Sequence, residues 1–190
     1  MPGSLGSRSI GGEFAIVYDS RSNLLNPNKG WYVEFTFGTY NKAFGSTHNF
    51  QLTRLDLRKY WNLSDEHWEV VALQLKTHFA SEGAPLSEMA FFGSEEIMRG
   101  FYEGRFIERN LIAFQMEYRR RIYGRLGGVV FAGLGDVNER LEDFTFSNLR
   151  PSIGVGLRFQ LDKRENLNLR FDTGFGKGAN NYYLNIAEAF

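Results

Sequence analysis

Hydrophobic and polar residues alternate along most of this chain with a period of two. In the segment 150–161, one set of alternate positions is apolar: Ile153, Val155, Leu157, Phe159 and Leu161. The other set is polar or small: Ser152, Gly154, Gly156, Arg158 and Gln160. Because a β-strand turns alternate side chains to opposite faces, this pattern predicts strands with one apolar and one polar face.

Nine segments are predicted to be strands, and no long segment has a helical period. They lie at 14–19, 31–40, 48–61, 68–80, 110–123, 126–137, 150–161, 167–172 and 182–190. Most are 9–14 residues long, whereas strands of globular proteins average about 5–6 residues. Strands that cross a membrane need about 9–11 residues.

The connections between these strands alternate in length. Those at 62–67, 124–125 and 162–166 are short and polar, whereas those at 41–47, 83–107 and 136–148 are mostly longer. Aromatic residues gather near strand ends: Trp31, Tyr60, Trp61, Trp68, Tyr123, Tyr182 and Tyr183. Short turns at one end, long loops at the other and aromatic girdles are typical of outer-membrane barrels.

Alternation alone fits either a soluble sandwich or a membrane barrel. Strand length, loop asymmetry and the terminal Phe190 favour the barrel. We therefore predict an all-β fold, an antiparallel transmembrane β-barrel of about eight strands, or half of a sixteen-stranded barrel. Nine is an odd count for a bacterial barrel, so the short segment 14–19 is the one expected not to span. The barrel domain covers 12–190, and residues 1–11 are interpreted as a flexible leader or cloning remnant.

Composition narrows the classes of function. Lys+Arg and Asp+Glu both number 22, and this zero net charge argues against a nucleic-acid partner. The chain has no cysteine and therefore no disulfide or thiolate metal site. No apolar run approaches the about 20 residues of a transmembrane helix, and mean hydropathy is −0.34.

Candidate chemical sites are weak. His48, His67 and His78 lack the spacing of metal ligands. The Gly174-x-Gly176-x-Gly178 pattern follows no βαβ unit and is interpreted as a strand end and loop. Glu95-Glu96 is interpreted as a solvated charge run. No Ser-His-Asp arrangement is apparent, so we expect no enzyme, metal or cofactor.

Several motifs together resemble the outer-membrane protein-assembly superfamily, also called the bacterial surface antigen family, over about 12–190. Asp19-Ser20-Arg21, Asn26-Pro27 and Lys29-Gly30-Trp31 resemble its first turn motif. Met98-Arg99-Gly100-Phe101, in the longest loop, looks like its Val-Arg-Gly-Phe motif. The segments 150–159 and 169–176 resemble its closing strands, and Tyr183, Ile186 and Phe190 fall in a segment like its terminal assembly signal. The likeness is to the carboxy-terminal half of BamA- and TamA-type barrels.

The resemblance implies roles for the loop motif. In the family this loop folds into the lumen, and its arginine binds acidic residues on the wall. Arg99 is the matching arginine, and Glu117 matches one wall acid. A guanidinium binds carboxylates in a bidentate manner, which suits such a lock. The chain departs from the family at Gly133, where an aspartate is frequent, and Asp136 is a candidate substitute.

The chain also departs from the family in size. Family barrels have sixteen strands and usually carry POTRA domains, so we expect a short form without them. An eight-stranded barrel is filled by its own side chains, which leaves three alternatives. The loop stays outside, two chains form a wider homodimeric barrel, or the chain is part of a longer protein.

The resemblance places the protein in the bacterial outer membrane, in contact with its lipid. It implies insertion or translocation of client barrel proteins, with the last strand as one side of a weak seam. An alternative is a membrane anchor or transport barrel for a fused or partner enzyme of patatin-like type. A third alternative is a soluble β-barrel that binds lipid.

Overall fold

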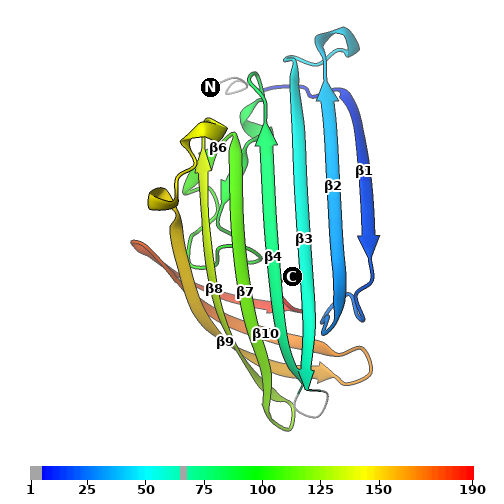
Figure 1. Ribbon diagram of the computed structural model, residues 1–190, viewed down its shortest axis with the longest axis vertical. Coiled ribbons are helices and arrows are strands. Elements are labelled where there is room, and N and C mark those ends of the chain that lie inside the picture. The colour runs from blue at the N-terminus through cyan, green and yellow to red at the C-terminus, as the bar shows by residue number, and fades with distance from the viewer. Residues whose placement is uncertain (1–5, 65–67) are drawn as a thin grey trace.

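The computed structural model describes residues 6–64 and 68–190 and consists of β-strands joined by turns and loops (Figure 1). His67, one of the histidines considered above, and residues 1–5 of the expected leader lie outside the described residues. The strands are β1 (Gly11–Asp19), β2 (Gly30–Tyr40), β3 (Phe50–Ser64), β4 (Glu69–Ala80), β5 (Ala90–Phe92), β6 (Phe106–Glu108), β7 (Asn110–Tyr123), β8 (Leu126–Asn138), β9 (Arg150–Asp162), β10 (Leu167–Gly176) and β11 (Ala179–Ile186). Four short 3-10 turns occupy Lys42–Phe44, Leu86–Glu88, Leu141–Asp143 and Phe146–Asn148.

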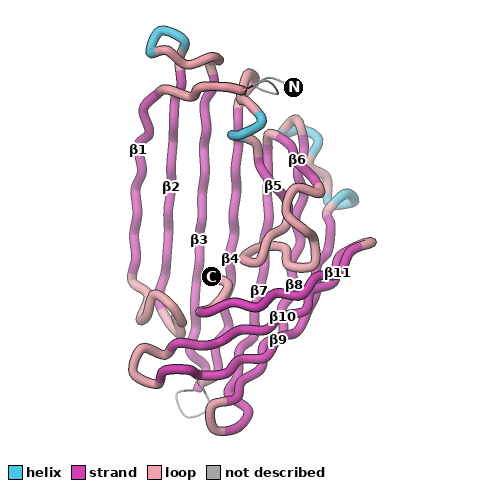
Figure 2. Tube along the Cα trace, turned by 180° about the vertical axis from the view of Figure 1, so that it is seen from behind, coloured by secondary structure: helices cyan, strands magenta, loops and turns pink. Residues whose placement is uncertain are grey.

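Nine of these strands form one antiparallel sheet in the order β1-β2-β3-β4-β7-β8-β9-β10-β11. Every neighbour in the order is also a neighbour along the chain once the β5–β6 hairpin is set aside, so the sheet is an up-and-down meander. Among the described strands, none pairs with the outer edge of β1 or of β11. The sheet curls strongly, so that β9 to β11 cross over the hollow side of β3, β4 and β7 (Figure 2).

The apolar side chains line the outer face of the sheet and the polar ones its concave face. On β9, Ile153, Val155, Leu157, Phe159 and Leu161 are each at least 41% exposed. Ser152, Arg158 and Gln160, on the opposite face, are buried. A soluble sandwich would bury the apolar set, whereas a membrane barrel turns it toward lipid. This arrangement confirms the predicted all-β barrel fold and the predicted faces of this strand.

The connections fall at two ends of the sheet. Residues 20–29, 124–125 and 163–166 lie at what we call the turn end, and 41–49, 81–109, 139–149 and 177–178 at the loop end. The predicted asymmetry holds for most connections. The exceptions are the ten-residue connection 20–29 at the turn end and the two-residue turn 177–178 at the loop end.

The first and last strands differ from their predicted bounds. β1 is nine residues long and pairs with β2 from Gly11 to Asp19, so it is a full member of the sheet. β11 runs from Ala179 to Ile186 and does not extend to Phe190. The reason is Ala187, whose φ of 75° breaks the extended conformation and turns the chain toward the concave side.

The two ends of the sheet meet at the turn end. The side-chain amide of Asn23 donates to the carbonyl of Glu165 (3.2 Å), and that of Asn26 donates to the carbonyl of Asn166 (3.1 Å). The Glu188 amide donates to the carbonyl of Leu25 (3.0 Å). The connection after β1 thus lies against the β9–β10 turn, as Figure 1 shows. Among the described residues, no helix is long and apolar enough to cross a membrane.

Candidate functional site

The long loop between β4 and β7 lies on the concave face of the sheet and has its own structure. Its ends form the β5–β6 hairpin, with Ala90, Phe91 and Phe92 opposite Glu108, Ile107 and Phe106. The fully buried ring of Phe101 packs edge-on against those of Phe92 and Phe106, with centroid distances of 5.1 and 6.2 Å and interplanar angles of 64° and 62°. The loop is therefore anchored by an aromatic cluster.

The main chain of the Met98-Arg99-Gly100-Phe101 motif is bent and bound on both sides. Met98 and Gly100 have φ values of 54° and 110°, and the second is a conformation that favours glycine. The Gly100 amide donates to the hydroxyl of Tyr183 (3.0 Å), and the Asn181 side-chain amide donates to the Gly100 carbonyl (3.0 Å). The Ser152 hydroxyl donates to the Arg99 carbonyl. These contacts fix the motif against β9 and β11.

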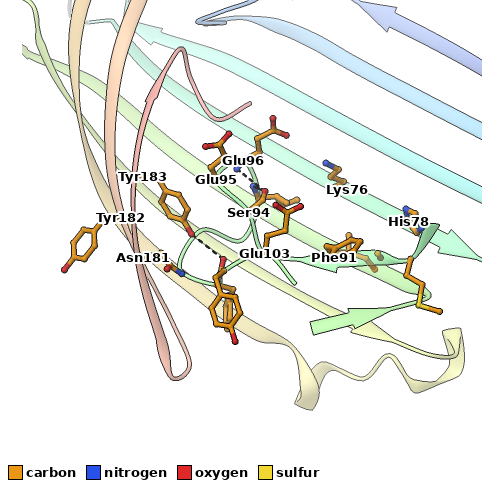
Figure 3. Close-up of a pocket in the computed structure, with 17 residues that line it drawn as sticks. Lys76, His78, Phe91, Ser94, Glu95, Glu96, Glu103, Asn181, Tyr182 and Tyr183 are labelled. Carbon is orange, nitrogen blue, oxygen red and sulfur yellow. Dashed lines mark hydrogen bonds between the residues drawn. The ribbon is translucent and has the colours of Figure 1, made fainter. Parts of the chain in front are cut away.

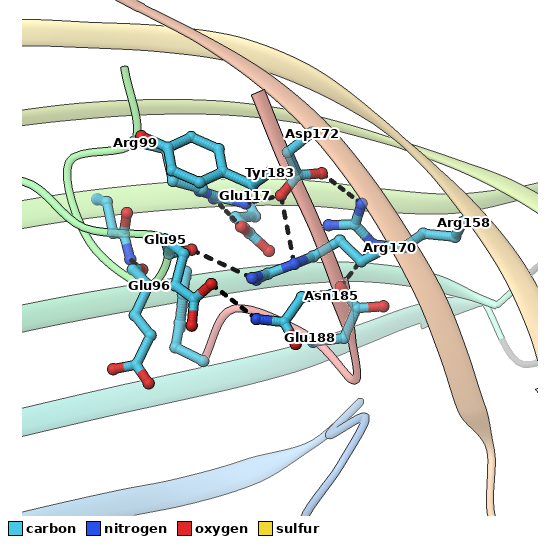
Figure 4. A network of polar contacts seen from close by, with 12 residues as sticks. Glu95, Glu96, Arg99, Glu117, Arg158, Arg170, Asp172, Tyr183, Asn185 and Glu188 are labelled. Atoms are coloured by element: carbon cyan, nitrogen blue, oxygen red, sulfur yellow. Dashed lines mark hydrogen bonds and ion pairs between the residues drawn. The ribbon is translucent and has the colours of Figure 1, made fainter. Parts of the chain in front are cut away.

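Arg99 joins three strands of the wall through its guanidinium. Its Nη1 lies 2.6 Å from Oδ2 of Asp172 on β10, and its Nη2 contacts Oε1 of Glu117 on β7 (Figure 4). Its Cζ lies 3.7 Å from the centroid of the Phe131 ring on β8. The side chains of Arg99, Glu117 and Asp172 are fully buried. The planar guanidinium donates to two carboxylates and stacks on an aromatic ring at the same time. A lysine ammonium, which is not planar, could not replace it in this arrangement.

The ion pairs of Arg99 belong to a wider buried network. Arg119 Nε lies 2.7 Å from the second oxygen of Glu117, and Arg158 Nη1 lies 2.5 Å from the second oxygen of Asp172. Arg158 Nε also lies 2.8 Å from Glu188, which follows β11. Glu117 and Asp172 therefore each bridge at least two arginines, so removing one group leaves a buried charge with one partner fewer.

Arg170 extends this network to the long loop, and Glu188 extends it to residues 187–190 at the end of the chain. Arg170 Nε lies 3.6 Å from Asp172, and its Nη2 donates to the Glu95 carbonyl (3.3 Å). Burial opposes ionisation of Glu188, but the guanidinium groups of Arg158 and Arg119 outweigh it and lower the pKa of that carboxyl. Glu188 is therefore ionised at neutral pH and holds the terminal segment to the wall.

Glycines on β10 let the loop approach the sheet. A Cβ on Gly174 would lie 2.6 Å from the Arg99 carbonyl carbon, and one on Gly176 would lie 2.5 Å from the Phe101 ring. The predicted strand end in this segment is confirmed, because β10 ends at Gly176. The glycine pattern provides room for the loop motif.

The structure places the residues singled out from the sequence in three settings. Met98, Arg99, Gly100 and Phe101 are buried in the loop, and Arg99 and Glu117 form an ion pair. Tyr183 faces the loop from β11, whereas Ile186 is 55% exposed on the outer face. Phe190 is buried on the concave side.

Sequence reasoning missed the second acid bound by Arg99. Asp136, the candidate substitute, pairs with Arg150, and Asp172 binds Arg99. A Cβ on Gly133 would lie 3.0 Å from the sulfur of Met98, so the motif's own side chain takes that space. The available signal was the position of Asp172 on the charged face of its strand, next to Arg170 in the alternate pattern.

A cavity of about 650 Å³ lies beside the motif, between the loop, β4 and β11 (Figure 3). Its lining includes Lys76, His78, Glu95, Glu103 and Tyr183. Glu95 and Glu96 are exposed, as the sequence predicted. Among the described residues, no group of three or more His, Cys, Asp or Glu could hold a metal ion.

Comparisons with known proteins identify the family to which this chain belongs. A family model described as the Omp85 superfamily domain matches residues 7–186. Among solved structures, the chain is similar to a crystal structure of BamA from Haemophilus ducreyi that lacks POTRA domains 1–3, with a TM-score of 0.73 and 14% sequence identity. The match covers 92% of this chain and 40% of that one, so the chain spans less than half of the BamA chain.

No protein in a search of curated sequences matches significantly. The family match extends from before β1 to the end of β11 and includes the loop motif. The fold, the outward apolar face and this match agree. The chain belongs to the Omp85 superfamily and is a β-barrel protein of the bacterial outer membrane.

Proposed function

We propose that this chain acts without enzymatic chemistry in inserting or translocating proteins at the outer membrane. The observation that supports this role is the free edge of β11, which has no partner among the described strands. An edge of this kind presents main-chain donors and acceptors that can pair with an incoming strand. The network behind it holds β7, β9 and β10 in place while the edge stays available.

The hydrogen bonds of β11 identify which amides face the free edge. The Ala187 amide donates to the Asn168 carbonyl (2.8 Å), whereas the Ile186 amide donates to the side chain of Asn185 (2.8 Å). Because main-chain groups of a strand point alternately to its two neighbours, the amides of Leu184 and Tyr182 face the open edge. A client strand would pair with these groups.

The test is folding of a client barrel in liposomes that contain the protein. Acceleration over empty liposomes is expected, and equal rates in both would contradict the proposal. Leu184→Pro removes an edge amide without removing a hydrogen bond to β10, so it should abolish the acceleration. Leu184→Ala keeps that amide and is the matched control, which should retain the activity.

A second candidate is an anchor or transport barrel for a fused or partner enzyme. The buried network favours it, because seven charged groups that join the loop, three strands and the terminal segment suit a rigid scaffold. Liposomes would then show no acceleration, and Leu184→Pro would leave retention of a partner enzyme at the membrane unchanged.

A further inference from the structure

Residues 187–190 leave the sheet and enter a pocket on its concave side. Ala189 and Phe190 are 5% and 4% exposed, although they follow a strand whose outer edge is open. They pack with Tyr60 of β3 and Ala72 of β4 in one buried cluster. The segment therefore crosses from the last strand to the middle of the sheet, where Figure 2 shows its end beside β3 and β4.

The pocket binds the acidic side chain of this segment with three groups. Glu188 Oε2 lies 2.8 Å from Arg158 Nε and 3.8 Å from Arg119 Nε. Its Oε1 accepts a hydrogen bond from the side-chain amide of Asn168 (2.8 Å). The Glu188 side chain is 1% exposed. These contacts come from β7, β9 and β10, so the carboxylate is bound by a preformed part of the wall.

The same pocket binds an aromatic ring two residues later. The Phe190 ring lies 6.3 Å from the Tyr60 ring and 5.3 Å from the guanidinium carbon of Arg119. Arg119 Nη2 also donates to the main-chain oxygen of Phe190 (2.9 Å). One arginine thus contacts the carboxylate, the ring and the main chain of the segment.

The pocket has donors beyond those that this segment uses. Among the described residues, Arg119 Nη1 and Arg158 Nη2 are buried and have no hydrogen-bond partner. Such groups can bind carbonyl oxygens of a peptide that lies deeper or in another register. A site that presents two guanidinium groups, an amide and an aromatic surface selects a carboxylate followed by an aromatic side chain.

We propose that Tyr60, Ala72, Arg119, Arg158 and Asn168 form a binding site for a peptide segment that carries a carboxylate two residues before an aromatic ring. We call it the acidic–aromatic pocket. Residues 187–190 occupy it within the same chain, and a second peptide of this chemistry competes with them. This pocket lies on the concave side, away from the free edge of β11, and the proposal does not depend on insertion activity.

The first experiment tests occupancy within the chain. The 190-residue sequence has no cysteine, so Ala72→Cys combined with Ala189→Cys reports the approach of two members of this one buried cluster. Oxidation of the detergent-solubilised protein should give an internal disulfide in the folded state. The control pair Ala132→Cys with Ala189→Cys should give none, because Ala132 lies on the outer face. Absence of the first disulfide, or its appearance only at twice the chain's mass, would overturn the assignment.

The second experiment tests binding of a separate peptide. The fluorescein-labelled hexapeptide Asn-Ile-Ala-Glu-Ala-Phe reproduces residues 185–190 and should bind saturably to a variant that ends at Ile186. Affinity for the complete chain should be about tenfold lower, and replacing the peptide's glutamate by glutamine should weaken binding about tenfold. Equal binding of both peptides would refute the proposal.

The third measurement does not need the shortened variant to fold. Unlabelled hexapeptide added to the complete chain with Ala72→Cys and Ala189→Cys should lower the disulfide yield in a concentration-dependent manner. The glutamine peptide should lower it much less. A yield that stays constant up to millimolar peptide, or that falls equally with both peptides, would show that the pocket does not accept a second segment.

Discussion

At the scale of single residues, Arg99 is expected to have a large effect on stability, because its side chain is fully buried between two carboxylates. Arg99→Ala would leave Glu117 and Asp172 buried with one partner fewer each. Breaking a buried ion pair from one side costs about 3–5 kcal/mol. The midpoint of urea unfolding in detergent, followed by tryptophan fluorescence, should fall accordingly. The control Arg140→Ala removes a guanidinium that is 68% exposed and should change stability by less than about 0.5 kcal/mol. Equal effects of both variants would show that the buried ion pairs of Arg99 do not stabilise the fold.

Gly174 tests a different contact of the same motif, the close approach of two main chains. A Cβ at this position would lie 2.6 Å from the Arg99 carbonyl carbon and the Gly100 nitrogen, neither of which can rotate away. Gly174→Ala should cost about 1–3 kcal/mol through overpacking and make the loop more sensitive to trypsin, since Arg105 and Arg109 flank β6. Gly12→Ala, where a Cβ would meet nothing within 4 Å, is the control. Unchanged loop cleavage in Gly174→Ala would contradict the close contact.

At the scale of elements, the period-two pattern predicted the strands well because the two faces of each strand meet different environments. Strand β9 is the clearest case: its apolar positions are exposed on the outer face and its polar positions buried. The end of β11 could not be predicted, because the turn at Ala187 is set by tertiary contacts of Glu188 and Phe190.

The acidic partners of Arg99 could likewise be predicted only in part. The resemblance indicated a lumenal arginine and Glu117, while Asp172 becomes a partner only because β10 curls across to the loop, 73 residues further along the chain. Local pattern fixes which face a side chain lies on, but the curl of the sheet decides which faces meet.

The outer face of β2 and β3, near the turn end, allows a prediction of depth in the membrane. The Lys59 ammonium nitrogen lies over both indole rings, 4.4 Å from the centroid of Trp31 and 5.4 Å from that of Trp61. Two indoles with a cation fit the headgroup level of a bilayer. In a Trp68→Phe background, lipids brominated near the headgroup should quench tryptophan fluorescence more than lipids brominated near the bilayer centre. Adding Trp31→Phe, Trp61→Phe and Phe35→Trp leaves a single indole, at position 35, which lies deeper along the outer face. Lipids brominated near the bilayer centre should then quench more than those brominated near the headgroup. The same order in both proteins would contradict this placement.

At the scale of the whole molecule, the nine-stranded sheet limits how barrels can be completed. Nine antiparallel strands leave β1 and β11 running in the same direction. Two copies related by an axis along the strands would therefore join β11 of one to β1 of the other in parallel, which is the weaker pairing and foreign to the antiparallel barrels of this membrane.

The turn end adds a second argument against two copies in one barrel. Asn23, Leu25 and Asn26 already bind Glu165, Glu188 and Asn166 of the same chain. Strands of another copy inserted between β11 and β1 would have to break these bonds. Native mass spectrometry of the detergent-solubilised 190-residue chain should therefore give one chain of 21.8 kDa per particle. Particles of twice that mass would mean that the contacts at the turn end open and that a homodimeric barrel forms despite the strand directions. Asn23→Ala with Asn26→Ala would then raise the share of the dimer, whereas a dimer held by other surfaces would not respond to these substitutions.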